Sequence, residues 1–169
     1  MFTFNISDDL KLACLQVADA EALFALIQQN KDHLGEWLPW VNHCHRIEDV
    51  QSFIQSAHTA YAEKKDIEAG IVLNDQLIGV FRMTFQHPIG NIGYWIGEDA
   101  QGQGIVTKTV KCMTDAFAPE VDEFEIFCPV GHVRSERVAM KAGFQLDPNY
   151  QPKPDSTFLL KRYIWKLNH

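Results

Sequence analysis

The feature that most constrains this 169-residue chain is a glycine-rich turn between a short apolar strand and a helix. The helix is predicted from one face with spacing i, i+3, i+4, i+7 and i+11, formed by Val106, Thr109, Val110, Met113 and Phe117. Gly102 and Gly104 keep side chains out of the turn, so successive backbone N–H groups can point at one ligand. Because these groups lie at a helix N-terminus, where the helix dipole adds partial positive charge, the turn predicts a phosphate or pyrophosphate ligand.

Two familiar phosphate-binding loops do not fit this turn. A Walker A loop ends in Gly-Lys-Ser or Gly-Lys-Thr, but Gly104 is followed by Ile105 and Val106. The dinucleotide-binding fingerprint needs a third glycine or an alanine where Thr107 stands. The turn therefore belongs to a different class of phosphate site.

The pattern that fits is Gln-Gly-x-Gly at 101–104, preceded by Gly-Tyr-Trp-Ile-Gly at 93–97. On these residues the chain resembles the GNAT superfamily of acetyl-coenzyme A-dependent N-acetyltransferases. Residues 135–144 are similar to the family's segment of a serine followed, eight residues later, by Gly-Phe. The resemblance implies a single GNAT domain over residues 1–169, with an α/β fold. Its central sheet would be mixed, mostly antiparallel and flanked by helices.

Composition limits the partners and the compartment. The length suits one domain with a full core, and 46% hydrophobic residues suit a packed globular protein. A net charge of -7 argues against nucleic acid or anionic membrane as a partner. The start of the chain lacks the basic region of a signal peptide, and no apolar run approaches the ~20 residues that span a bilayer. The four cysteines form no Cys-x-x-Cys pair, so we expect reduced thiols in a cytoplasmic protein.

Hydrophobic periodicity predicts the order of elements. We expect strands at 10–14, 67–73, 77–85, 91–97, 124–128, 144–146 and 157–167. Helices are expected after an N-cap at Asp19, around 50–61, from Val106, and around 135–142 with Gly143 ending the last one. In the strand 77–85, strict alternation places Leu77 and Val80 on opposite faces.

The segment 33–41 holds Trp37 and Trp40 around Pro39. It can be a packed connection between helices, or it can be a wall that faces the substrate. The GNAT branch that acetylates ribosomal-protein N-termini carries a similar run.

The resemblance assigns the cofactor contacts. Backbone groups of Tyr94, Ile96 and Gly97 would bind the pantetheine arm and the thioester of acetyl-CoA. The pyrophosphate would be held by Gln101, Gly102, Gln103, Gly104, Ile105 and Val106. His132 stands where the family usually has asparagine, and histidine can still donate to a cofactor oxygen.

The implied reaction is direct attack of a neutral amine on the acetyl thioester. An α-amino group has a pKa near 7.7–8.0, so roughly a quarter is neutral near pH 7.4, against about 0.1% of a lysine. An N-terminal substrate therefore needs only a weak base. Asn91 occupies the position where relatives often have a carboxylate, and Glu98 and Asp99 read as solvated turn residues.

Ser135 is the residue expected to protonate the leaving thiolate, as the family's serine does. It can also cap a helix, and one hydroxyl could do both. Cys128 is expected to pack rather than react, and Tyr150 and Tyr163 are alternative acids. The sequence His43-Cys44-His45 has no second cluster at metal-ligand spacing, so no metal site is predicted. The acidic run 120–123 reads as a solvated connection.

These observations predict an enzyme that transfers acetyl from acetyl-CoA to a primary amine. The expected acceptor is a protein N-terminus, as in the ribosomal-protein serine or alanine acetyltransferases. Two alternatives stay open: a small amine such as a polyamine, amino acid or antibiotic, and a GNAT-fold protein that binds acyl-CoA without turnover. Dimers are common in this branch, so a homodimer is possible.

Overall fold

The computed structural model describes residues 1–154 and 156–166, and the chain divides into two compact units. The first contains Met1–Met83 and Tyr94–Ile105, and the second contains Thr84–Gly93 and the chain from Val106 onward. The strands β4 (Gln76–Gln86) and β5 (Ile89–Ile96) each run from one unit into the other. Each unit is thus built from two separate chain segments, and the single domain over 1–169 stays a prediction.

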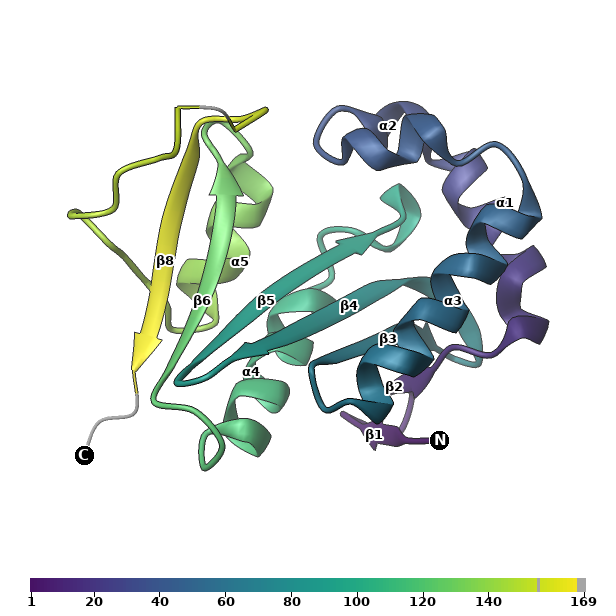
Figure 1. Cartoon of the computed structure of the whole chain (residues 1–169), viewed down its shortest axis with the longest axis horizontal. Helices are drawn as coiled ribbons and strands as arrows, with labels where there is room; N and C mark the ends of the chain where they lie inside the picture. Colours follow the sequence, from purple (N-terminus) through teal and green to yellow (C-terminus); the bar gives the residue numbers. More distant parts are fainter. Residues whose placement is uncertain (155, 167–169) are drawn as a thin grey trace. The chain divides into compact units, whose positions relative to one another are not determined.

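The strands of the described residues form one mixed eight-stranded sheet, in the order β1-β2-β3-β4-β5-β6-β8-β7. Figure 1 shows β6 and β8 side by side in the second unit. In the first unit, β1 (Thr3–Asn5) pairs antiparallel with β2 (Leu10–Cys14), which pairs antiparallel with β3 (Asp66–Leu73). The sequence predicted β2, β3 and β4, but it missed the three-residue β1. Asn74 and Asp75 have positive φ angles of 48° and 61°, which suit the two-residue turn between β3 and β4.

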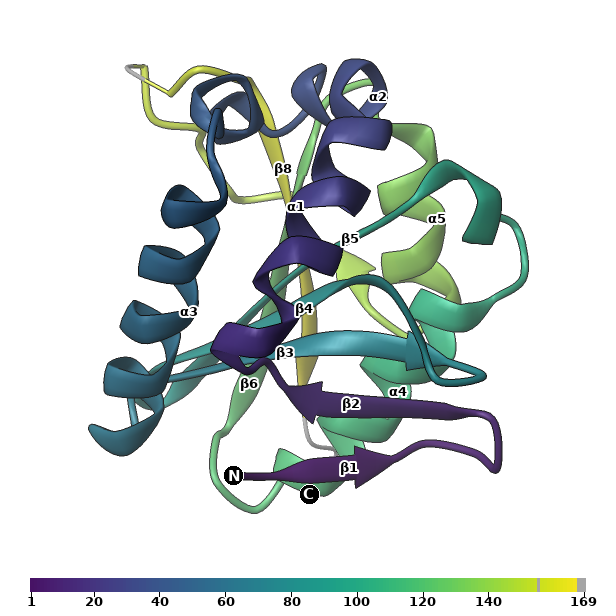
Figure 2. The same cartoon turned by 90° about the vertical axis from the view of Figure 1, so that its right-hand side faces the viewer.

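Three α-helices complete the first unit: α1 (Ala20–Gln29), α2 (Lys31–Gly35) and α3 (Ile47–Ala62). Short 3₁₀ turns lie at Val17–Asp19, Pro39–His43 and Glu98–Ala100. Figure 2 shows α3 beside α1, and α3 also packs on β3. Asp19 precedes α1 as predicted, but its carboxylate does not cap that helix. It accepts a hydrogen bond from the backbone N–H of Gln16 (2.7 Å) and so closes the preceding 3₁₀ turn.

The helices of the first unit meet the sheet in an apolar cluster. Its buried members are Leu15, Ala20, Leu23, Ile27, Leu34, Val41, Cys44, Val50, Ile54 and Val80, and Leu77 and Trp95 pack against it from its edge. Leu77 and Val80 therefore face the same cluster, so the strict alternation predicted for this strand is wrong. The interruption falls at Gly79, where an added Cβ would lie 2.2 Å from the carbonyl oxygen of Trp95. A close approach of two strand backbones at a glycine explains the local break in the pattern.

The second unit contains most of α4 (Ile105–Phe117), together with β6 (Glu123–Pro129), α5 (Val133–Lys141), β7 (Gln145–Leu146) and β8 (Leu160–Lys166). β6 pairs in parallel with the start of β5, from Ile89↔Glu123 to Asn91↔Glu125. β8 lies antiparallel to both β6 and β7. The closing strand was predicted through Leu167, and that last residue lies outside the described part of the chain.

Local predictions for the second unit are mostly confirmed. Phe124, Ile126 and Cys128 are buried on one face of β6. Gly143 follows α5 with a φ of 94°, as expected of the residue that ends a helix. The acidic run 120–123 is not wholly solvated, because Glu123 forms ion pairs with Arg162 and with Lys166 (3.0 Å to Lys166).

Candidate active site

The glycine-rich turn has the backbone that its sequence predicts. Gly102 and Gly104 have φ angles of 76° and 73°, in the region that L-residues rarely adopt, and α4 starts directly afterwards at Ile105. Apart from each glycine and its two chain neighbours, no atom of the described residues lies within 4 Å of a Cβ built at either glycine. The glycines are therefore required by backbone conformation, and the space above them stays open. Such a turn at a helix N-terminus fits a pyrophosphate group.

The start of the turn is fixed by a buried asparagine that the sequence reasoning did not assign. Asn30 directly follows α1 and is 7% exposed. Its Oδ1 accepts a hydrogen bond from the backbone N–H of Glu98 (2.9 Å), and its Nδ2 donates to the carbonyl of Leu26 (2.9 Å). An amide on an otherwise apolar helix face was the available signal, because a buried polar group needs partners.

The glutamine side chains of the motif hold the turn to its own unit. Gln101 Nε2 lies 2.6 Å from His33 Nε2, and His33 Nδ1 lies 3.7 Å from a carboxylate oxygen of Glu98. Gln103 Nε2 donates to the carbonyl of Asp99 (3.4 Å). His33 belongs to α2, so α2 and the turn are joined by side chains. No sequence pattern indicates this link between two residues that are 68 positions apart.

Some backbone groups assigned to the cofactor already have partners. The N–H of Gly97 donates to the carbonyl of Ile78 (2.9 Å), and its own carbonyl accepts from Ala100 (3.1 Å). The N–H of Gln101 donates to the carbonyl of Glu98 (3.1 Å). A carbonyl can accept a second hydrogen bond, so the carbonyl is the group of Gly97 that a ligand can use.

The segment with the paired tryptophans is partly packed and partly exposed. Leu34 and Val41 are buried, whereas the side chain of Trp40 is 45% exposed. The rings of Trp40 and Trp95 have centroids 6.4 Å apart at an angle of 55°, the distance range of interacting aromatic pairs. Trp95 directly follows Tyr94, so the exposed ring is connected to the strand assigned to pantetheine.

Ser135 lies in the second unit, in the first turn of α5, and is 8% exposed. Its Oγ is 3.3 Å from the Sγ of the buried Cys128. The residue that precedes the helix is the half-buried His132, so the prediction of Ser135 as the N-cap is wrong. Burial raises the pKa of Cys128 to about 11, which keeps the thiol neutral and agrees with a packing role.

The two tyrosines considered as acids, Tyr163 and Tyr150, each contact a different residue. Tyr163 is 3% exposed and donates a hydrogen bond to Oε2 of Glu136 (3.1 Å). Burial and this bond raise the pKa of Tyr163 to about 12. The ring of Tyr150 packs against Phe127, with centroids 5.3 Å apart. Burial alone would raise the pKa of Glu136, but hydrogen bonds from Lys161 (3.0 and 3.1 Å) and Tyr163 hold it below its usual value.

The carboxylates near the predicted base position are already engaged or solvated. Asn91 Nδ2 donates to Glu125 Oε1 (3.2 Å), and the other oxygen of Glu125 accepts from Arg162 Nε (2.6 Å). The side chain of Glu98 is 62% exposed and Asp99 is also exposed, which confirms the prediction for both. Within residues 1–154 and 156–166, no three His, Cys, Asp or Glu side chains are grouped to hold a metal ion.

The fold and the glycine-rich turn at 101–104, called the phosphate turn from here on, together define a class of acyltransferases. The family profile described as "Acetyltransferase (GNAT) domain" matches residues 9–145. This chain belongs to the GNAT acetyltransferase family, and it is an enzyme that uses acetyl-CoA.

Two curated relatives cover most of the chain. It is 31% identical over 150 residues to YdaF of Bacillus subtilis (strain 168), named as a candidate ribosomal N-acetyltransferase, a match over 85% of this chain and 82% of the relative. It is 29% identical over 150 residues to the ribosomal-protein-serine acetyltransferase of Escherichia coli (strain K12), over 86% and 84% of the two chains.

Solved structures share the fold over nearly the full length. The microcin C7 self-immunity acetyltransferase MccE, in complex with acetyl-CoA and AMP, has a TM-score of 0.89 and 25% identity over 96% of this chain and 94% of its own. RimL, a ribosomal L7/L12 α-N-protein acetyltransferase in complex with coenzyme A, has a TM-score of 0.90 and 22% identity over 98% of both chains. The predicted GNAT fold, with a mixed sheet flanked by helices, is confirmed.

In the described part of the chain, every helix is too short or too polar to cross a lipid bilayer.

Proposed function

We propose that this enzyme transfers the acetyl group of acetyl-CoA to the N-terminal α-amine of a protein, with ribosomal proteins as the acceptor class. The assignment of acetyl-CoA rests on the turn directly before α4, in which Gly102 and Gly104 have positive φ angles. The acceptor half is supported by the two curated relatives, both named for ribosomal acetylation. The exposed Trp40 beside Trp95 supplies an aromatic surface suited to a peptide.

In this proposal the chain holds acetyl-CoA mainly through its backbone. The pyrophosphate binds at Gln101, Gly102, Gln103, Gly104, Ile105 and Val106, with the Gln101 side chain anchoring the turn through His33. Tyr94, Ile96 and the Gly97 carbonyl serve the pantetheine arm by strand-like pairing. His132 donates to a cofactor oxygen from the position before α5.

The part of the reaction that falls to the side chains of this protein is proton transfer. Acetyl-CoA supplies the acetyl group as an activated thioester. The proposed role of Ser135 is to give a proton to the departing sulfur, and its hydroxyl is oriented by the neutral thiol of Cys128 (3.3 Å). A thiol has a pKa of about 8.5, so a general acid gives only a moderate gain at this step.

A thiol-release assay with acetyl-CoA tests the acceptor. Peptides with free Ser or Ala N-termini are compared with the same peptides N-blocked but containing lysine, and with a polyamine. We expect turnover with the free N-terminal peptides alone. Preference for the polyamine would replace the protein acceptor with a small amine.

Location and assembly belong to the same proposal. A ribosomal acceptor places the enzyme in the cytoplasm, with a protein rather than nucleic acid or membrane as its partner. The homodimer implied by the resemblance is tested by light scattering after size-exclusion chromatography.

A further inference from the structure

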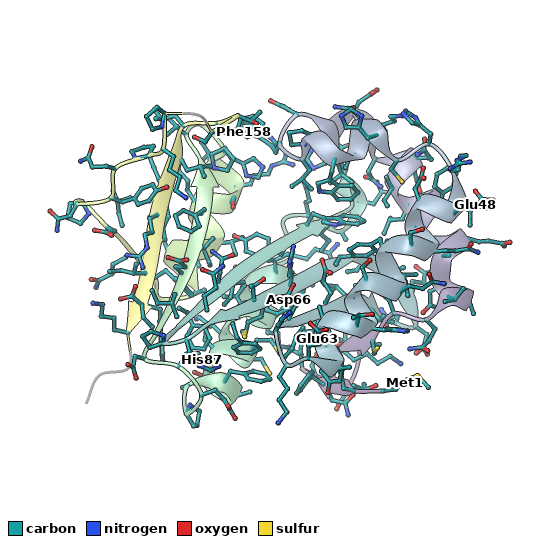
Figure 3. The ribbon with its side chains drawn as sticks, viewed as in Figure 1. Met1, Glu48, Glu63, Asp66, His87 and Phe158 are labelled. Carbon is teal, nitrogen blue, oxygen red and sulfur yellow. The ribbon has the colours of Figure 1, made fainter. Side chains whose placement is uncertain are left out.

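A carboxylate on the sheet of the first unit has a weaker partner than its neighbours. Glu68 lies on β3, and its side chain is 13% exposed. Arg82 of β4 contacts Asp66 at 2.5 Å, but its Nε is 3.9 Å from Glu68 Oε1. Figure 3 labels Asp66, at the start of β3. Arg82 therefore contacts Asp66 more closely, and the largely enclosed Glu68 has Arg82 only as a more distant ion-pair partner.

Glu68 lies on the same face of the sheet as the tryptophans. A Cβ built at Gly70 would lie 2.6 Å from Leu77 and 3.0 Å from Leu15, both part of the apolar cluster. Glu68 precedes Gly70 by two residues on the same strand, so it shares that face. Trp95 packs against the same cluster and against the exposed Trp40.

Arg82 gives an independent check on this placement. It follows the buried cluster residue Val80 by two positions on β4, so it shares the face of the cluster. Its contacts with Asp66 and Glu68 confirm that all three side chains are on that face. Two strand residues span about 6.6 Å, so Glu68 lies one such step along β3 from Gly70, whose Cβ position is next to Leu15 and Leu77 of the cluster.

The charge environment of Glu68 suits a proton acceptor. Burial raises the pKa of Glu68 above its usual value, Arg82 opposes that rise in part, and Asp66 adds to it. On α3, which packs against β3, His58 is directed to the carbonyl of Leu15 (2.6 Å), and Glu63 is paired with Lys65 in the link to β3. A base is most effective when its pKa approaches the working pH. Glu125, by contrast, accepts a close hydrogen bond from Arg162 Nε (2.6 Å).

We propose that Glu68 is the base that accepts the proton of the acceptor amine, an inference that rests on the proposed function. The amine nitrogen forms a bond to the acetyl carbonyl carbon, and the carbon–sulfur bond breaks with its electron pair going to sulfur. The acceptor enters as an ammonium and first gives one proton to the Glu68 carboxylate, which passes it to solvent. The nitrogen loses its second proton as the amide forms, and the departing sulfur takes up one proton from solvent by way of Ser135 and leaves as a thiol.

The test compares Glu68→Gln with wild type on a free-Ser peptide from about pH 6.5 to about pH 9. Near pH 7 we expect kcat/KM for the peptide to fall about 10-fold to 100-fold, with KM for acetyl-CoA unchanged. The loss should shrink toward the alkaline end, because the α-amine then loses its proton unaided. Glu63→Gln is the matched control, since this exposed carboxylate is five residues away, and it should follow wild type at every pH.

Two further readouts separate a base from a structural residue. Glu68→Asp keeps a carboxylate and should recover part of the rate. Glu68→Gln should melt no lower than wild type at alkaline pH, because it removes a buried charge while Arg82 keeps Asp66. Because the pKa of Glu68 is raised by folding, its contribution to stability is fully present below the pKa of the unfolded chain and is lost as pH rises through the pKa of the folded protein. The melting temperatures should therefore be compared above neutral pH.

Wild-type kcat/KM in Glu68→Gln across the pH range would overturn the proposal, and so would a loss that does not change with pH. If Glu68→Gln does not fold, Glu68→Asp is used instead. An acidic limb of the kcat/KM pH profile that is the same in Glu68→Asp and in wild type would then overturn the proposal. If wild type acetylates no free N-terminus, the acceptor proposal fails. The same variants, measured on whichever amine wild type does acetylate, then still decide the role of Glu68.

Discussion

The phosphate turn of the first unit and the Ser135 region of the second unit are built in different ways. The turn is made of backbone, and its shape follows from two glycines two residues apart in front of a helix. The Ser135 region is made of side chains from β6, α5 and β8: Cys128 contacts Ser135, and Glu136 accepts hydrogen bonds from Lys161 and Tyr163. A backbone site can be recognised in a short stretch of sequence, whereas a side-chain site depends on strands that only the fold brings together.

The largest effect that would test this contrast is expected at Gly104. Gly104→Asp should abolish binding of CoA measured by titration calorimetry, because it places a negative charge beside the pyrophosphate. Gly104→Ala adds only the conformational cost of a non-glycine residue at positive φ, about 1–2 kcal/mol, and should weaken binding about tenfold. Unchanged CoA affinity in Gly104→Asp would remove the turn from the cofactor site.

The next effect concerns the side-chain region. Ser135→Ala should lower kcat about 10-fold to 100-fold and leave CoA affinity unchanged, because the hydroxyl acts on the leaving sulfur and not on the pyrophosphate. Steady-state kinetics together with calorimetry separate the two quantities. Cys128→Ala tests the partner of the hydroxyl and should cost less turnover than Ser135→Ala. A wild-type rate in Ser135→Ala would reduce Ser135 to a packing residue.

A smaller effect is expected where a side chain supports the backbone site. Asn30→Ala leaves the N–H of Glu98 without its acceptor, so the free energy of unfolding should fall by about 1–3 kcal/mol. Loss of this anchor should also weaken CoA binding, by less than Gly104→Asp does. Gln29→Ala, one residue earlier and exposed, is the control and should leave both quantities near wild type.

The smallest effect is expected at Tyr163. Tyr163→Phe removes the hydrogen bond to Glu136 and should cost about 1 kcal/mol of stability, with kcat changed less than by Ser135→Ala. The lowered pKa of Glu136 adds stability above its usual value of 4.5, which is lost as pH falls through the lower folded value. Urea unfolding should therefore show the difference between Tyr163→Phe and wild type at neutral pH and a smaller one in acid. A kcat loss larger than that of Ser135→Ala would make Tyr163 the acid.

How much could be predicted from the sequence depends on how far apart in the chain the interacting residues are. Local periodicity predicted β2, β3, β4, β6 and α3, and glycine chemistry predicted the turn and the end of α5. The short α2 and β1 were missed because five and three residues carry too little periodic signal.

The misses within the candidate site have a common cause. Asn30, His33 and Glu68 were not assigned because each is defined by a contact across the fold, as with His33 and Gln101. The face of Leu77 was assigned wrongly because strict alternation assumes an uninterrupted strand, which Gly79 breaks. Ser135 was placed at a helix start that in fact falls two residues earlier.

The interleaving of the two units has a consequence for the order of synthesis. The first unit has all its segments once Ile105 has left the ribosome, so its hairpin and helices can assemble while the rest is still being translated. The second unit has to wait, because β6 pairs with β8, which ends at Lys166. A nascent chain that stalls between these points would carry β6 without its partner β8, and an unpaired strand edge is the part of a sheet most open to association.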